Sequence, residues 1–393
     1  RVSLRARALI KRPLSIFCGS VSPQSGGYMI KILHVISDSN FGGAGRLLLN
    51  LIAESDKKNF DISVAVPQGS ALKPRIEMLG VKVFEVSLNL GELRRLIKAQ
   101  KPQIVHTHAA ATARVAARLC GVPVTLNTRH CADCCQTRFS IFRRIITNLF
   151  DTIFTSMTIA TADYVKNVLK SEGIPPKKIA VIINGSLPLR RLSHDERTAA
   201  RARSGYKEND FLAGIVARTE RGKGQEYFIE AARICEKSHP EIKFLIVGDG
   251  SMRKQLQNLA SGLSNLKFLG FLPDVTEIMN ILDVNANCSY ISETSSLSLS
   301  EGMSVGAIPI VSVCGGNPFM AKDCGFTLPQ KNAAALAEKL IYLSQNREKA
   351  QALKSAATER FFAEFTSSRM AKETEKLYFE LLNRTVFSKN LLT

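Results

Sequence analysis

Short apolar runs alternate with amphipathic stretches along most of the chain. The first run, residues 29–37 (MIKILHVIS), ends in a polar, glycine-rich turn that leads into an amphipathic stretch at 46–53. A nearly continuous apolar run of this length, closed by a turn, is typical of a parallel strand buried on both faces. Alternation of such strands with helices predicts an α/β fold with parallel, doubly wound sheets.

The alternation occurs twice, in two units of similar size separated by a polar segment. In the first unit we expect further strands at 62–66, 81–86, 104–108, 122–127, 159–160 and 179–183, and helices at 90–99, 112–119 and 139–154. In the second unit we expect strands at 211–218, 244–248, 266–272, 284–289 and 308–313, and helices at 225–237, 252–260, 275–282 and 297–306.

These units predict two Rossmann-like domains that face each other across a cleft. The predicted boundaries are a leader at 1–28, a first domain at 29–190, a linker at 191–209, a second domain at 210–375 and a helical tail at 376–393. In open parallel sheets, ligands bind outside the carboxyl ends of the strands, so functional side chains are expected in the turns after strands.

Composition is that of an ordinary globular protein, with 45% hydrophobic and 22% charged residues. No apolar run reaches the roughly 18–20 residues that a membrane span needs. The net charge of +19 is uneven, since basic and acidic residues number 22 and 11 in residues 29–190 but 26 and 23 in residues 191–393. A basic first half suits anionic lipid or a phosphorylated ligand, and no nucleic-acid-binding motif accompanies it, so nucleic acid is not a predicted partner.

The leader and the cysteines bear on where the protein works. Residues 1–28 contain five basic residues and no acid. They suit either translated upstream sequence or a mitochondrial-type presequence. The nine cysteines are an odd number, and several lie in apolar runs, which favours reduced thiols and a cytoplasmic protein over a disulfide framework.

Two constellations in the second unit suit an anionic, elongated ligand. Arg218 and Lys223 share one strand–helix turn, where two cations suit a diphosphate. Glu293 and Glu301 flank the start of a helix expected near Ser295, whose free N–H groups would form an anion site. At 1.5 Å per residue the two carboxylates lie about 12 Å apart along the chain, enough to contact different ends of one ligand. The alternative is a capped surface helix and loop whose charges are solvated.

Histidines and cysteines of the first unit raise the question of a metal. His106 and His108 end one strand on the same face, and His130 ends the next strand. A metal site would need a further well-placed ligand and a carboxylate shell, and the cysteines at 131, 134 and 135 have no second pair to complete a zinc site. We therefore predict no metal.

The phosphate chemistry also predicts no cofactor. Asp-x-Asp, which would hold Mg²⁺ or Mn²⁺ on a diphosphate, does not occur in the sequence, so Arg218 and Lys223 would take the place of the metal. The Gly248-Asp249-Gly250 turn lacks the third glycine of the dinucleotide fingerprint, which argues against NAD.

The motifs together resemble a known family. Their order along the chain is Val216-Ala217-Arg218 with Lys223-Gly224, Val247-Gly248-Asp249-Gly250, Leu269-Gly270-Phe271, Glu293 and Glu301 as Glu-x7-Glu, Gly306 to Val311 (GAIPIV), and Gly315-Gly316-Asn317-Pro318. This series resembles the retaining glycosyltransferases of family 4, the group 1 transferases with a GT-B fold, from Met29 to about residue 380.

The resemblance implies a role for each candidate residue. Arg218 and Lys223 would hold the diphosphate of a nucleoside diphosphate sugar, Glu301 would bind its ribose, and Glu293 would lie at the sugar or the reaction centre. His130 would contact the donor sugar from the first domain. The remaining donor-site residues would be Gly43 at the phosphates, Gly248 near the nucleotide, and Ser295, Ser296 and Leu297 at the helix start. The tail helix would cross back to the first domain.

The implied activity is transfer of a hexose with retention to a hydroxyl of a lipid-linked or saccharide acceptor, in synthesis of cell-surface polysaccharide, lipopolysaccharide or glycolipid. Two positions depart from the family pattern: Thr294-Ser295-Ser296 replace a glycine or proline, an aromatic residue and a glycine, and Phe319 replaces a glutamate. The alternative is a GT-B nucleotide-sugar binding protein or epimerase without transferase activity.

A basic amphipathic segment suggests where the enzyme acts. Residues 138–150 (RFSIFRRIITNLF) mix three arginines with large apolar residues at helical spacing. Such a helix can lie in the interface of an anionic membrane, which predicts a peripheral protein on the inner face of the cell membrane. The alternative is a core helix whose arginines line solvent.

Overall fold

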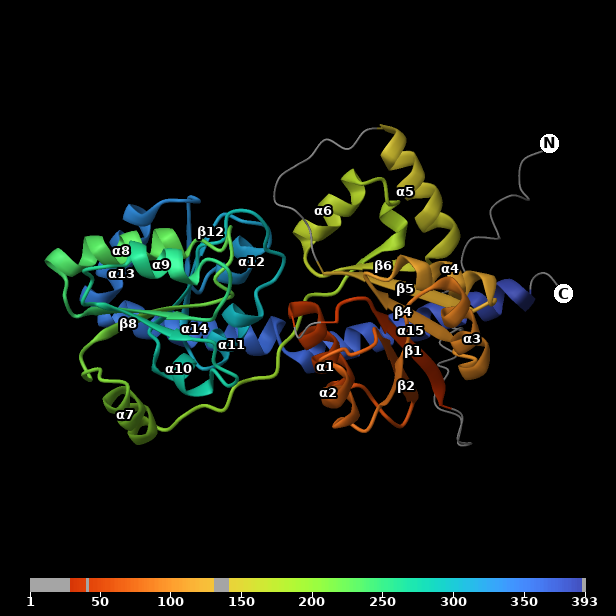
Figure 1. Ribbon diagram of the computed structural model, residues 1–393, viewed down its shortest axis with the longest axis horizontal. Coiled ribbons are helices and arrows are strands. Elements are labelled where there is room, and N and C mark those ends of the chain that lie inside the picture. The colour runs from red at the N-terminus through yellow and green to blue at the C-terminus, as the bar shows by residue number, and fades with distance from the viewer. Residues whose placement is uncertain (1–28, 40–41, 131–140, 391–393) are drawn as a thin grey trace, which may run out of the picture.

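The computed structural model describes residues 29–39, 42–130 and 141–390. They form two α/β domains that lie side by side, and a long C-terminal helix lies along the first domain (Figure 1). Each domain contains one all-parallel sheet. The predicted fold class, two Rossmann-like domains with doubly wound parallel sheets, is confirmed.

The first sheet has the strand order β3-β2-β1-β4-β5-β6-β7. Alternate residues of its central strand face opposite layers: Ile32 packs towards α1 and the C-terminal helix, whereas Leu33 and Val35 pack towards α3 and α4. This two-sided burial explains why the strand is apolar along its length. The strands are β1 (Ile30–Ile36), β2 (Phe60–Val66), β3 (Lys82–Glu85), β4 (Ile104–His108), β5 (Val124–Arg129), β6 (Met157–Ala160) and β7 (Ile179–Val181). The helices are α1 (Gly43–Glu54), α2 (Lys73–Glu77), α3 (Leu90–Gln100), α4 (Ala111–Leu119), α5 (Ile141–Phe154) and α6 (Asp163–Ser171).

The second sheet has the strand order β10-β9-β8-β11-β12-β13. Its core is formed by strand residues such as Phe211 and Phe244 against Phe228 of α8, all fully buried. The strands are β8 (Phe211–Val216), β9 (Ile242–Val247), β10 (Leu266–Gly270), β11 (Val284–Asn287), β12 (Ile308–Ser312) and β13 (Phe326–Leu328). The helices are α7 (His194–Arg203), α8 (Gln225–Ser238), α9 (Arg253–Leu259), α10 (Thr276–Ile281), α11 (Leu297–Ser304), α12 (Asn317–Ala321), α13 (Ala333–Gln345) and α14 (Arg347–Glu364).

In both sheets the strand order reverses at one point, between β1 and β4 and between β8 and β11. A reversal of this kind leaves a crevice at the carboxyl ends of the two strands, which is where ligands bind in such sheets. The segments that follow β1, β4, β8 and β11 are therefore the ones to examine for a site.

The segment predicted as a linker contains a helix, α7, between residues 194 and 203. It packs on the second domain because Ala200 is fully buried and Arg201, also buried, pairs with Asp283 at 2.9 Å between Nη2 and Oδ2. The charge run that suggested a linker is thus the outer face of a docked helix.

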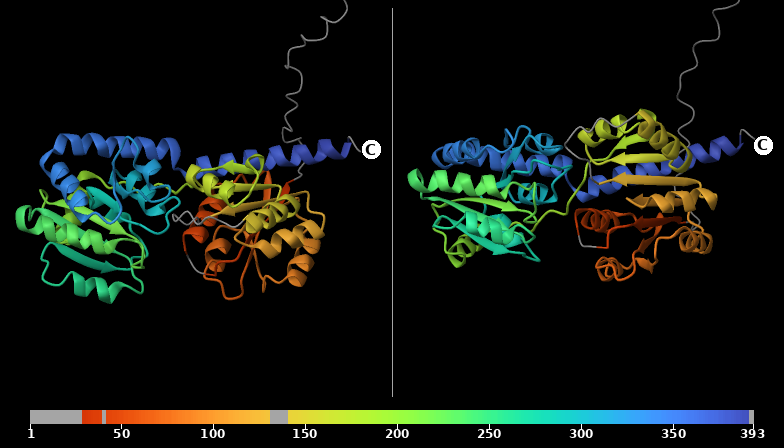
Figure 2. Two further views of the ribbon diagram at one scale, coloured as in Figure 1. Left: turned by 90° about the horizontal axis from the view of Figure 1, so that it is seen from above. Right: turned by 45° about the horizontal axis from the view of Figure 1, so that its top comes forward.

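The C-terminal helix, α15 (Ser367–Asn390), crosses from the second domain to the first (Figure 2). It begins before the predicted tail boundary at 376, since Met370 and Ala371 already join Tyr378 and Leu381 in the core of the first domain. In the described ranges, Cys120, Cys235, Cys288, Cys314 and Cys324 form no disulfide.

The two chain crossings between the domains are hydrogen-bonded to each other. The Ser186 amide donates to the Phe365 carbonyl at 2.9 Å, and the Ser367 amide donates to the Ser186 carbonyl at 3.0 Å. A Cβ at Gly185 would lie 2.3 Å from the Thr366 carbonyl oxygen, so only glycine allows this approach. The crossings form one narrow connection.

Candidate functional site

Lys223 and Glu293 meet where β8 and β11 end. Lys223 lies in the turn between β8 and α8, and its Nζ is 3.0 Å from Glu293 Oε2. The same oxygen accepts from Asn287 Nδ2 at 3.2 Å and from Ser289 Oγ at 3.1 Å. No described residue donates to Oε1, so one oxygen of this oriented carboxylate is open to a ligand.

Glycines allow the turn after β8 to approach its neighbours closely. Gly224 has a φ of 79°, and a Cβ there would lie 2.1 Å from the Cys288 carbonyl oxygen. Gly248, after β9, has a φ of 128°, and a Cβ would lie 2.0 Å from the Ala217 carbonyl oxygen. Gly248, which was predicted to lie near the nucleotide, thus packs directly against the loop that carries Arg218. The side chain of Arg218 is exposed.

Helix α11 begins at Leu297, the predicted first residue of the helix at 297–306, and Ser295 lies two residues before it. Its N-cap is Ser296, whose Oγ accepts from the Leu299 amide at 3.3 Å. Ser295, Ser296 and Leu297 therefore lie at the positive end of the helix dipole, which favours an anion. Glu301 follows one turn later.

Glu301 is buried and forms an ion pair with Arg46 of α1 across the two domains. Burial raises the pKa of the Glu301 carboxyl, and the charge of Arg46 opposes that rise. Arg46 was not among the predicted site residues, because its partner lies 255 residues away in the sequence.

The first turn of α1 faces the second domain, since it carries Arg46. Gly43 is its first residue, and a Cβ there would meet no atom within 4 Å. No acidic residue lies in this first turn. The position predicted for phosphate contact thus combines open space with a helix N-terminus.

His130 directly follows β5 and is held from both domains. Its carbonyl oxygen accepts from Thr294 Oγ1 of the second domain at 3.0 Å. Its ring Nε2 lies 2.8 Å from His108 Nδ1. Burial lowers the pKa of His130 to about 4, so the imidazole is neutral at neutral pH.

The predicted histidines belong to a larger buried cluster that includes His34 of β1. The ring nitrogens of His34, His106 and His108 lie close enough together to surround a metal ion. However, both nitrogens of His106 are already bonded, to Tyr378 Oη at 2.6 Å and to Thr128 Oγ1 at 2.7 Å. The rings therefore satisfy one another without an ion. The cysteines at 131, 134 and 135 lie outside the described residues.

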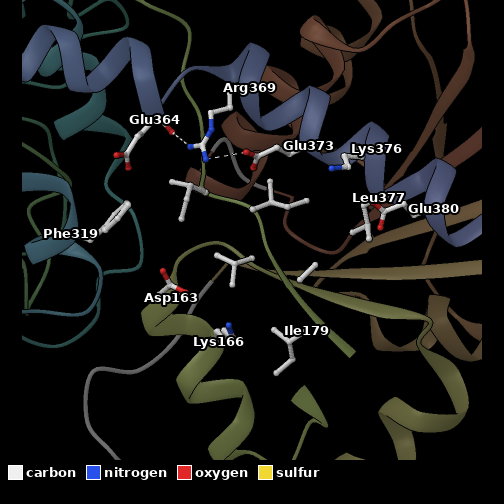
Figure 3. Close-up of a pocket in the computed structure, with 14 residues that line it drawn as sticks. Asp163, Lys166, Ile179, Phe319, Glu364, Arg369, Glu373, Lys376, Leu377 and Glu380 are labelled. Atoms are coloured by element: carbon white, nitrogen blue, oxygen red, sulfur yellow. Dashed lines mark hydrogen bonds and ion pairs between the residues drawn. The ribbon is translucent and has the colours of Figure 1, made fainter. Parts of the chain in front are cut away.

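A groove of about 620 Å³ lies between α6, β7 and α15 (Figure 3). None of the predicted site residues lines it. Arg369, which borders it, pairs with Glu373 at 3.0 Å and donates to the Glu364 carbonyl at 2.7 Å. The charge of Arg369 is thus used within the protein, and the groove lies apart from the predicted donor-site residues.

Phe319, which replaces the family glutamate, packs at the edge of this groove. The Arg360 guanidinium lies 5.0 Å from its ring centroid and donates to its carbonyl oxygen at 2.7 Å. Phe319 therefore has a packing role, which an acid could not fill in the same way.

Helix α5 carries an exposed apolar stripe next to arginines. Ile141 and Phe142 are 76% and 69% exposed, and Ile145, Ile146, Leu149 and Ile153 are each at least half exposed. Arg143 and Arg144 are exposed on the same helix. No helix in the described ranges has both the length and the apolar character of a membrane span.

Two family models cover most of the chain. The model for glycosyl transferases group 1 matches residues 196–360, and the model for Glycosyltransferase Family 4 matches residues 41–186. The UDP-Gal:alpha-D-GlcNAc-diphosphoundecaprenol alpha-1,3-galactosyltransferase of Escherichia coli is 29% identical over 320 residues, which cover 75% of this chain and 82% of that protein.

Solved structures of the same fold include Anabaena HepE. Its complex with UDP superimposes with a TM-score of 0.80 at 19% identity, covering 89% of this chain and 100% of HepE. Its complex with UDP-glucose gives a TM-score of 0.76 at 20% identity, again over 89% of this chain and 100% of HepE.

Proposed function

The chain belongs to the group 1 glycosyltransferases of family 4, and we propose that it transfers a hexose from a uridine diphosphate sugar to a lipid-linked acceptor with retention at the anomeric carbon. It is a nucleotide-sugar-dependent glycosyltransferase of polysaccharide synthesis. The choice of uridine and of a diphosphate-linked lipid rests on the donor and acceptor named for the Escherichia coli galactosyltransferase.

The observation that carries the donor-site proposal is the contact of Lys223 with Glu293 at the ends of β8 and β11. Departure of the nucleoside diphosphate places negative charge on its terminal phosphate. Lys223, Arg218 and the N-terminus of α11 would stabilise this charge, an electrostatic effect that is commonly the largest in catalysis. The open Oε1 of Glu293 would accept from a hydroxyl of the sugar.

Glu301 would bind the ribose. A carboxylate has two oxygens that can accept hydrogen bonds from two neighbouring hydroxyls. In the free protein this carboxylate is paired with Arg46, so ribose would displace the guanidinium when the donor enters.

The proposed transfer is metal-independent. Cationic side chains already lie on the turn where a metal would bridge the phosphates, and no Asp-x-Asp occurs in the sequence. Retention would follow from attack of the acceptor hydroxyl on the face that the leaving group departs from, with the departing phosphate taking the proton.

Helix α5 would hold the enzyme at the membrane that contains the acceptor. A stripe of six exposed apolar residues beside two arginines suits the interface of an anionic bilayer. Each basic residue near such a surface contributes about 1 kcal/mol. The enzyme would then work at the inner face of the cell membrane.

The test is an assay with UDP-glucose, UDP-galactose and their N-acetyl forms, each with a polyprenyl diphosphate-linked N-acetylhexosamine as acceptor. We expect acceptor-dependent release of UDP and a product with the anomeric configuration of the donor, both insensitive to EDTA. Lys223→Met should abolish most of the release, whereas Lys349→Met, at an exposed position on α14 of the same domain, should not. Interconversion of the donor without transfer would instead identify an epimerase.

A further inference from the structure

A line of imidazoles runs from the interior of the first sheet to His130. His34 Nδ1 lies 3.1 Å from His108 Nε2, and His108 Nδ1 lies 2.8 Å from His130 Nε2. The rings are stacked, with centroids 5.4 Å apart for the first pair and 5.1 Å apart for the second. His34 lies in β1, His108 ends β4, and His130 directly follows β5. These strands are neighbours in the sheet, so the sheet fixes the spacing of the three residues.

The chemistry of neutral imidazole couples the three rings. A neutral ring has one N–H donor and one nitrogen acceptor. Because both nitrogens of His108 are engaged, its tautomer decides which nitrogen of His130 carries the proton. The bond to His34 couples the tautomer of His108 to that of His34 in the same way. The hydrogen-bonding character of His130 is thus linked to that of His108 without any charge in the core.

One nitrogen at the end of this chain has no partner. Among the described residues, His130 Nδ1 is the buried ring nitrogen that makes no hydrogen bond. A buried polar atom left unsatisfied destabilises the protein, and such an atom in a ligand site is commonly satisfied by the ligand. The open end of the chain is thus at the residue proposed to contact the sugar.

The backbone of His130 is fixed separately, by the second domain. Thr294 Oγ1 donates to its carbonyl oxygen at 3.0 Å, and Thr294 is the neighbour of Glu293 in the chain. The ring is thus oriented by the first domain and the backbone by the loop that carries the carboxylate of the donor site.

A metal ion at His34, His106 and His108 fits the structure less well than a hydrogen-bonded chain of neutral imidazoles. It would have to break a bond of His106 to Tyr378 or Thr128, and the bonds that link His108 to its neighbours. No carboxylate is part of the cluster in the described ranges to balance a dication.

We propose that His108 is a positioning residue, which holds the His130 imidazole neutral, in one tautomer and one orientation, so that Nδ1 meets a hydroxyl of the donor sugar. This inference rests on the proposed function, because the contact of His130 with the sugar is part of that function.

The test compares two amide replacements of His108. The side-chain amide of asparagine reaches the position of Nδ1, and that of glutamine reaches the position of Nε2. His108→Asn can therefore still bond His130, whereas His108→Gln keeps the bond to His34 and loses the one to His130. We expect His108→Gln to lower kcat/KM for the donor by about tenfold or more, the order of loss seen when the orienting partner of a functional imidazole is removed. His108→Asn should stay within about threefold of the wild type.

A spectroscopic readout tests the chain independently of activity. The sequence has six histidines, so ¹⁵N-histidine labelling gives few enough ring signals to assign by substitution. His130 should show the ¹⁵N shifts of a single neutral tautomer in the wild type and in His108→Asn, and averaged shifts in His108→Gln. His194→Gln, on the exposed start of α7, is the matched control and should leave the His130 signals unchanged.

The outcomes are distinguishable. Equal losses in the asparagine and glutamine variants, with melting temperatures equal to each other, would overturn the positioning role. So would averaged shifts of His130 in the wild type, or one equivalent of zinc bound to the purified protein and lost in His106→Gln. If the wild type transfers no sugar but shows the single tautomer, the proposed function fails and the imidazole chain stands.

Discussion

The buried histidines predict a steep loss of stability in mild acid. His34 is 1% exposed, and burial lowers its pKa from the ordinary value of 6.5 to about 3. Burial also holds the pKa of His106 and of His108 well below the ordinary value. In the unfolded chain these imidazoles take up protons as pH falls through 6.5, but in the folded protein they do not. The unfolded state therefore binds more protons, and stability is full above pH 6.5 and falls towards about pH 3.

The size of the stability loss depends mainly on the pKa of the imidazoles in the unfolded chain. At pH 5.5, one unit below the unfolded pKa, keeping one imidazole neutral costs about 1.4 kcal/mol more than at pH 7.5. His34, His106, His108 and His130, whose pKa is about 4, together should lower the free energy of unfolding by about 5 kcal/mol over this interval. That is a large part of the roughly 5–15 kcal/mol that stabilises a typical domain.

The measurement is urea unfolding followed by circular dichroism at pH 7.5, 6.5 and 5.5. His106→Gln should reduce the pH-dependent loss by about a quarter, whatever its effect on stability at pH 7.5. His194→Gln, an exposed position, should leave the pH dependence unchanged. An equal free energy of unfolding at pH 7.5 and 5.5, or an undiminished loss in His106→Gln, would refute the reasoning.

Four further outcomes follow from the site. Lys223→Met should lower turnover on the order of 10²- to 10³-fold. Glu301→Ala should mainly weaken donor binding, as measured by titration calorimetry. Wild-type behaviour of both variants would remove the donor-site assignment. Arg46→Gln should tighten donor binding about two- to fivefold by freeing Glu301, and weaker binding would show that Arg46 holds the donor instead. Initial rates should be the same with and without EDTA, and loss of activity restored by Mg²⁺ or Mn²⁺ would contradict the metal-independent proposal. Flotation with anionic vesicles should fall with salt and in the Arg143→Glu/Arg144→Glu double variant, and failure to bind such vesicles at low salt would dismiss the membrane surface.

The fold could be predicted from sequence wherever burial leaves a local pattern. Strand β1 is buried on both faces, so its apolar run is visible without any partner. Helix α7 is different, because its polar surface resembles a linker and its docking depends on the pair of Arg201 with Asp283, 82 residues away. Helix α6 was also not predicted, being short and followed closely by a turn.

Prediction of the site from sequence is limited in the same way, because several of its contacts join residues that are far apart in the sequence. Lys223 and Glu293 could be proposed one by one from the turns they occupy, since those turns follow strands. The contacts of Arg46 with Glu301 and of Thr294 with His130 join residues from different domains, and nothing local marks either pair. His34 lies within the apolar pattern of β1 and becomes notable only beside His108.

The paired chain crossings determine how the two domains can move. Because Ser186 is bonded to both Phe365 and Ser367, the connections act as a single pivot and not as two separate tethers. Sliding one domain past the other, or pulling them apart, would break these bonds, whereas rotation about them preserves the bonds. Displacement then grows with distance from the pivot, so a rotation of given angle separates Thr294 from His130 without unfolding either domain. Rotation about this point is the relative motion of the domains that breaks the fewest bonds at the crossings, and we expect entry of a donor and release of its nucleotide to use it.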